Sequence, residues 1–209
     1  MIPELLTYIP GTETSQMVVR GIQDLVGNEG IRTLLSLGKI PFTWSGETTR
    51  LENKLSPEQL CAIQFFLESI YGQAGGQGII LRAGRTFFDD FLRDRGQSIG
   101  LTDLDILTLP TKKRIRAGLE VLSPAASEAF CSIVRIEEDA EQWSWRVEEC
   151  PWCLRLKDKG LPHCTFDTGF LQSYLSWVTG GKIYDIRESE CLNMGASACV
   201  TNIQKAPLS

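Results

Sequence analysis

Histidine is almost missing from this chain of 209 residues, which contains only His163. A serine or cysteine nucleophile needs a nearby base, so a Ser-His-Asp or Cys-His system has this one candidate. The chain also lacks the Gly-x-Ser-x-Gly nucleophile elbow, and its acidic residues form no distinctive catalytic pair. These absences argue against hydrolase chemistry.

Basic excess and long apolar runs are missing too. The 21 Lys and Arg are outnumbered by 26 Asp and Glu, which leaves a net charge of -5. A nucleic-acid partner is not expected, because phosphate binding needs a basic surface. No apolar run reaches about 18 residues, so membrane association is at most peripheral. The first residues do not have the pattern of a signal peptide. We therefore expect a cytoplasmic protein.

The apolar periodicity predicts an α+β fold with helices packed on a twisted antiparallel sheet. We expect one domain over 1–209, with a mostly helical part (1–110) and a cysteine-rich part (111–209). The segment 41–54 is interpreted as a loop. Expected helices include 57–71, 79–95, 111–130 and 168–179, and expected strands are 132–138, 143–148, 183–187 and 199–203.

A glycine-rich segment, 72–78, interrupts the helical pattern. It follows a helix and no Gly-Lys-Ser/Thr comes after it, whereas a phosphate-binding loop follows a strand and ends in that motif. A flexible connector is therefore favoured over a phosphate site.

Cysteine, in contrast, is abundant, with five of its seven residues in the last third of the chain. Cys164 precedes a predicted helix, and Glu188 and Cys191 flank the end of a predicted strand. Cys199 begins the next strand, so the four side chains should meet at one end of the sheet. Three thiolates and a carboxylate fit a closed tetrahedral zinc site, which is structural because no position remains for water.

Other interpretations remain open. Cys150 or Cys153 can replace Glu188 to give an all-cysteine site, and this Cys-x-x-Cys pair can also be redox-active. All five thiols can instead be buried small hydrophobes, as we expect for Cys61 and Cys131. His163 is interpreted as a neighbour of the site or as a further ligand.

The C-terminal half, from about residue 112, resembles the 4-vinyl reductase domain family. The resemblance rests on an ordered set of motifs: Ile115-Arg116-Ala117-Gly118-Leu119, Val134-Arg135-Ile136-Glu137-Glu138, Cys150-Pro151-Trp152-Cys153, Pro162-His163-Cys164, Gly169-Phe170-Leu171, Glu188-x-x-Cys191 and Gly195-x-x-x-Cys199.

The resemblance implies a fold like that of TRAPP tethering-complex subunits, dimerisation through helices, and binding of hydrophobic small molecules. It also implies a zinc site of the form Cys, Glu-x-x-Cys, Cys, which falls on Cys164, Glu188, Cys191 and Cys199. A tetrapyrrole such as a chlorophyll precursor is the implied ligand, with a role in pigment biosynthesis, photosynthesis or photosystem assembly. The chain has no dinucleotide-binding fingerprint, so reductase activity is not favoured.

The leading hypothesis is thus a non-enzymatic carrier of a hydrophobic molecule with structural zinc. The alternatives are a protein-interaction scaffold of tethering-complex type and an accessory subunit in tetrapyrrole vinyl reduction. Apolar pocket walls with few polar anchors are typical of such carriers. The candidate ligand-binding residues are Phe65, Phe66, Arg82, Arg85, Phe87, Phe88, Phe91, Trp143 and Trp145.

Overall fold

The computed structural model describes residues 11–46, 48–153 and 164–208. Its helices are α1 (Gly11–Leu37), α2 (Pro57–Arg95), α3 (Leu104–Leu107), α4 (Thr111–Phe130) and α5 (Thr165–Thr179), with the short 3-10 helix η1 (Leu192–Met194). Its strands are β1 (Phe42–Ser45), β2 (Thr48–Leu51), β3 (Ile133–Glu138), β4 (Gln142–Glu148), β5 (Tyr184–Glu190) and β6 (Cys199–Pro207). The expected α+β fold is confirmed. None of the described helices has the length and apolar character needed to span a bilayer.

The main sheet contains four antiparallel strands in the order β3-β4-β6-β5. Alternate residues of β4 are buried, as a strand with one covered face requires. Val147, near the end of β4, lies opposite Cys199 at the start of β6. The pairing of β5 with β6 is irregular, since Glu188 lies opposite Thr201 while Glu190 lies opposite Val200. The end of β4, the start of β6 and the end of β5 therefore meet at one end of the sheet.

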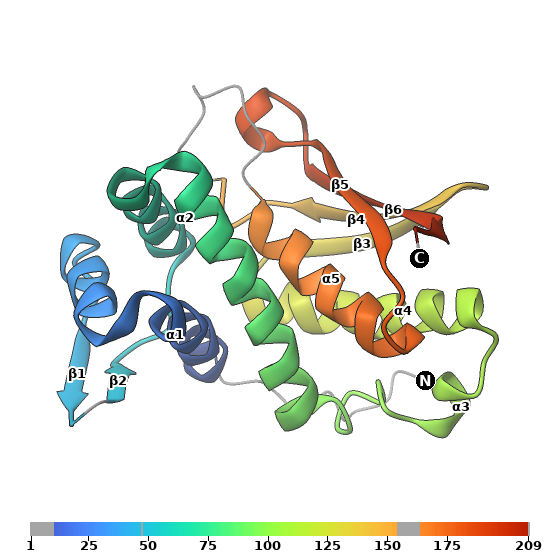
Figure 1. Cartoon of the computed structure of the whole chain (residues 1–209), viewed down its shortest axis with the longest axis horizontal. Helices are drawn as coiled ribbons and strands as arrows, with labels where there is room; N and C mark the ends of the chain where they lie inside the picture. Colours follow the sequence, from blue (N-terminus) through green and yellow to red (C-terminus); the bar gives the residue numbers. More distant parts are fainter. Residues whose placement is uncertain (1–10, 47, 154–163, 209) are drawn as a thin grey trace.

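Helices α4 and α5 pack on strands of this sheet, α2 packs across α5, and α1 packs on α2 (Figure 1). The crossing of α2 and α5 is close because glycines of both helices lie in it. A Cβ atom at Gly84 would lie 2.2 Å from the carbonyl oxygen of Phe166. Aromatic rings fill the space beside this crossing, where Phe87 of α2 contacts Phe166 and Phe170 of α5.

The prediction of a loop over 41–54 is wrong, because β1 and β2 form an antiparallel hairpin there. Its strands have only four residues each, too few for a clear period-two pattern. Thr49 and Leu51 are nevertheless buried on alternate positions of β2.

The predicted connector over 72–78 is also wrong, because α2 continues through it with a kink at Gly72. Gly72 has φ 74° and ψ 162°, a conformation that is essentially restricted to glycine. After the kink the helix passes close to its own first part, where a Cβ at Gly76 would lie 2.6 Å from the backbone nitrogen of Glu68. The glycines therefore permit a sharp, tightly packed bend.

Candidate functional site

Five cysteines of the C-terminal half gather where the strands of the main sheet end. Cys150 and Cys153 belong to the turn after β4, closed by a hydrogen bond from the Cys153 amide to the Cys150 carbonyl (3.2 Å). Cys164 is the residue before α5, Cys191 lies between β5 and η1, and Cys199 begins β6. All five side chains are buried.

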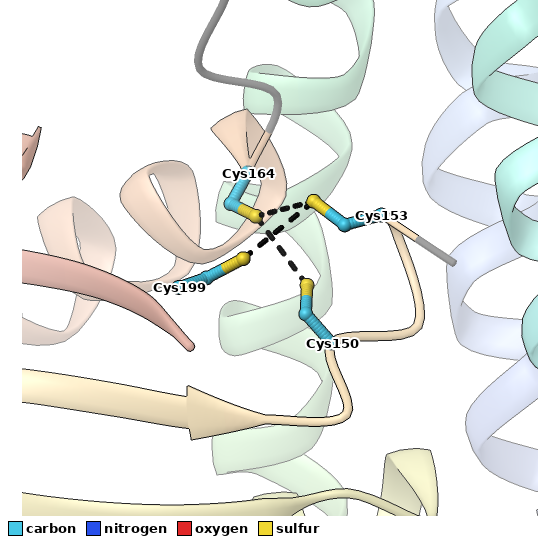
Figure 2. Close-up of side chains that lie close together, drawn as sticks. All are labelled: Cys150, Cys153, Cys164 and Cys199. Carbon is cyan, nitrogen blue, oxygen red and sulfur yellow. Dashed lines mark hydrogen bonds between the residues drawn. The ribbon is translucent and has the colours of Figure 1, made fainter. Parts of the chain in front are cut away.

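The sulfur atoms are in mutual contact (Figure 2). The Cys164 sulfur lies 3.3 Å from that of Cys150 and 3.3 Å from that of Cys153. The Cys153 sulfur lies 3.5 Å from that of Cys191 and 3.6 Å from that of Cys199. Tetrahedral zinc with Zn–S bonds of about 2.3 Å separates its sulfur ligands by about 3.8 Å. The spacing of these thiols is therefore close to that of a mononuclear tetrahedral centre.

Glu188 completes the cluster from β5. Its Oε2 accepts a hydrogen bond from the backbone amide of Cys164 at 3.0 Å. Its Oε1 is buried and has no hydrogen-bond partner among the described residues. On the opposite side, the backbone amide of Leu192 donates to the Cys199 sulfur at 3.4 Å, a contact that favours a thiolate. Two kinds of metal ligand, thiolate and carboxylate, are thus available.

The electrostatics of the cluster favour a cation. Burial raises the pKa of Cys150 to about 11 and that of Glu188 to about 8. Hydrogen bonds from the neighbouring thiols, Cys150 first, lower the pKa of Cys199. Burial also raises the pKa of nearby Asp167 to about 8, with repulsion from Cys199 and Glu188 adding to it. Protons and negative charge therefore compete for one small volume, which a divalent metal ion would relieve.

Two sets of four side chains have donor atoms within 4.8 Å of one another. One set contains Cys164, Glu188, Cys191 and Cys199, which are the ligands predicted from the sequence. The other contains Cys150, Cys153, Cys164 and Cys199, and it includes both cysteines of the alternative site. The buried cluster can hold a metal ion, and the choice of ligands stays a prediction.

The remaining candidates near the cluster have different positions. His163 lies outside the described residues. Cys61 is buried, as expected, and its thiol donates to the Trp152 carbonyl at 3.5 Å. The expectation that Cys131 is a core residue is wrong, because it is exposed at the C-terminus of α4 with its sulfur 2.9 Å from Lys54 Nζ.

The predicted ligand-binding residues do not share one surface. Phe87, Phe88 and Phe91 are buried in the core, and so are Trp143 and Trp145. Phe65 is 41% exposed and contacts the ring of Phe66. Arg82 is exposed on α2. Their part in ligand binding stays a prediction.

Arg85 lines a hollow of about 330 Å³ between α2, α5 and β5. Its guanidinium donates to Gln172 Oε1 at 3.0 Å through Nε. Lys182 supplies a second positive charge, and apolar side chains, including Leu175 and Ile186, form part of the wall. Ile183 also lines the hollow and is 59% exposed. Sequence reasoning missed all of these residues except Arg85, because they come from three separate parts of the chain.

The fold is that of H-NOX domains. A structure from a study of heme distortion in the H-NOX family has a TM-score of 0.61 and 11% identity, covering 95% of this chain and 97% of that one. An H-NOX protein from S. oneidensis in the Fe(II)NO state has a TM-score of 0.58 and 13% identity, with coverage of 95% and 100%. The NMR structure of an H-NOX domain from Shewanella oneidensis in the Fe(II)CO state gives 0.54 and 12%, with coverage of 90% and 97%.

The sequence assigns the family more narrowly. Residues 143–205 match the family model of the 4-vinyl reductase domain, which confirms the resemblance stated above. The matched segment runs from β4 to β6 and includes all five clustered cysteines and Glu188. No curated protein is significantly similar to the chain in sequence.

Proposed function

We propose that this chain is a non-enzymatic binding protein for an apolar small molecule that carries an acidic group. The hollow beside Arg85 is the observation that carries the proposal, because it combines an apolar wall with two cations. A guanidinium and an ammonium recognise carboxylates through charge-assisted hydrogen bonds. Neither Arg85 nor Lys182 forms an ion pair among the described residues, so both charges are available to a ligand.

A tetrapyrrole such as a chlorophyll precursor is the ligand that we propose. It has a large apolar ring and carboxylate side chains, which suit a hollow with an apolar wall and a cationic rim. The match to the 4-vinyl reductase domain and the H-NOX fold support this choice, since the similar structures come from proteins whose heme ligand is itself a tetrapyrrole. A role in handling photosynthetic pigments would follow from such binding.

Absorption titration with protoporphyrin IX tests the proposal. The double variant Arg85→Gln/Lys182→Gln should bind at least about tenfold more weakly, because hydrogen bonds to charged groups contribute about 1.5–3 kcal/mol each. Arg82→Gln is the matched control, since Arg82 lies one turn away on α2 and does not line the hollow. Equal affinity of the wild type and the double variant would refute binding at this hollow.

We also propose that the thiol cluster holds zinc in a structural role. The four sulfur atoms of Figure 2 come from the turn after β4, the start of α5 and the start of β6, so a shared ion would fix these three elements together. Thiolates are soft ligands that select zinc over harder cations. Elemental analysis of the purified protein tests this, and a chain free of bound metal after zinc loading would refute it.

A further inference from the structure

The two possible ligand sets overlap, and the overlap is informative. Cys164 and Cys199 belong to both sets, whereas Cys150 and Cys153 belong to one, and Glu188 and Cys191 to the other. The cluster therefore contains six donor side chains. Two tetrahedra that share an edge need six donors, two of which bridge both metal ions. Zinc modules with six cysteines and two ions are built on this principle.

A single four-coordinate ion does not account for the whole cluster. If it binds Cys150 and Cys153, then Glu188 keeps a buried Oε1 without a hydrogen-bond partner among the described residues. Such an atom is costly unless a cation or a donor faces it. If the ion binds Glu188 and Cys191 instead, the two thiols of the Cys-x-x-Cys turn remain buried and uncoordinated.

We propose that the cluster binds two zinc ions bridged by the thiolates of Cys164 and Cys199. The first ion is completed by Cys150 and Cys153. The second is completed by Glu188, through its unpartnered Oε1, and by Cys191. This inference rests on the proposal that the cluster binds zinc, and it adds a second ion and assigns the bridging ligands.

The arrangement of the backbone suits this assignment. Figure 2 shows Cys150 and Cys153 together on one side of Cys164 and Cys199. Glu188 and Cys191 come from a different element, β5 and the residue after it. The bridging ligands come from the start of α5 and the start of β6. The contact of 3.5 Å between the Cys153 and Cys191 sulfurs must open on loading, because terminal ligands of the two ions point apart.

Charge balance supports two ions. Metal ligands must be deprotonated, so six coordinated donors carry six negative charges. One zinc ion would leave four of these charges buried, whereas two ions leave two, as in an ordinary four-thiolate zinc site. No ion pair to Glu188 occurs within residues 11–46, 48–153 and 164–208, so basic side chains of this part do not supply the missing charge.

Native mass spectrometry of the chain, reduced, stripped with chelator and saturated with zinc, counts the ions directly. We expect two zinc ions per chain. X-ray absorption of the same sample should show a zinc neighbour within about 4 Å of each zinc, as in other two-metal sites. Zinc is the only probe needed, and the spectroscopic readout does not depend on any activity.

Two complementary variants assign the ions, and each retains one complete ligand set. Cys150→Ser/Cys153→Ser should bind one zinc with three sulfur ligands and one oxygen ligand. Glu188→Gln/Cys191→Ser should bind one zinc with four sulfur ligands. Both should lose the zinc–zinc signal. Cys61→Ser and Cys131→Ser are the controls, because these cysteines lie outside the cluster, and both should keep two ions.

The wild-type stoichiometry decides between the proposals. One zinc per chain at saturation, without a zinc neighbour, would overturn the two-ion site and leave the single structural zinc standing. No bound zinc would overturn both. Two ions with no change in either double variant would place the second ion elsewhere and overturn the assignment of bridging ligands.

Discussion

Gly169 of α5 lies directly against the backbone of Leu81 in α2. A Cβ atom at Gly169 would lie 1.9 Å from the carbonyl oxygen of Leu81, a distance that no side chain can occupy. Since the obstacle is backbone, the two helices themselves would have to move apart. The absence of a side chain at Gly169 therefore sets how closely α2 and α5 approach.

We expect Gly169→Ala to lower the free energy of unfolding by about 3 kcal/mol or more, the upper range for overpacking in a core. Chemical denaturation measures this change. Gly78→Ala is the control, because a Cβ there meets nothing within 4 Å on the exposed side of α2. That control should be stabilised by about 0.5–1 kcal/mol, since alanine is the better helix former. A fully stable Gly169→Ala protein would contradict the close crossing.

Gly72→Ala should destabilise the protein by about 1–3 kcal/mol, the usual cost of a conformation reserved for glycine. Its Cβ also meets nothing within 4 Å, so a steric clash with other residues is not involved. The comparison with Gly78→Ala isolates the backbone effect, because both positions lie in α2 and in open space. Equal stabilities of the two variants would mean that α2 is not kinked at Gly72.

Removal of the bound metal should destabilise the fold. Chelation of the zinc-loaded protein should lower the free energy of unfolding by about 4 kcal/mol if free zinc exceeded the dissociation constant about 1,000-fold. Thermal unfolding with and without chelator measures the change. Cys164→Ser should abolish most of the difference, whereas Cys131→Ser, at the exposed end of α4, should leave it intact.

Glu138 should give the protein a small dependence on acidic pH. A hydrogen bond from Lys205, 2.6 Å away, is the main reason that the pKa of Glu138 is below its usual value. An acid with a lowered folded-state pKa stabilises the fold above its unfolded pKa of about 4.3, and the contribution disappears as the pH falls through the lower folded value.

Lys205→Met tests this dependence. The variant should lose at most about 1 kcal/mol at neutral pH, as expected for a partly exposed pair. The difference from wild type should shrink as the pH falls below the folded pKa of Glu138. Lys182→Met, an exposed lysine without an ion pair in the described part of the chain, should show no such trend. A difference that stays constant with pH would refute the coupling.

The strands of the main sheet and the helix before β5 could be predicted from the sequence because their patterns are long and regular. The alternation of Trp143, Trp145 and Val147 identifies β4 without further information. The kink at Gly72 could not be predicted in the same way. Four glycines among seven residues suggest a break, and only the packing of Gly76 on Glu68 explains why the helix resumes at once.

The metal ligands could be predicted because cysteine is rare and clustered, so sequence position alone carries information. The ligand hollow could not, since its wall combines Arg85, Lys182 and residues of α5 that look like ordinary surface positions. Buried rings such as Phe87 drew the prediction toward the core instead. Hydrophobicity identifies residues that are covered, but it does not distinguish a covering side chain from a covering ligand.

The irregular pairing of β5 explains the spacing of two of its candidate ligands. Side chains alternate along a regular strand, so Glu188 and a residue three positions later would point to opposite faces. The extra residue between Glu188 and Glu190, relative to β6, changes this alternation and lets Cys191 share a face with Glu188. A chain shortened by Ser189 would keep both ligands on one face of a regular ladder, whereas one additional residue would turn them apart. Over evolutionary time this segment should therefore accept the loss of a residue more readily than the gain of one.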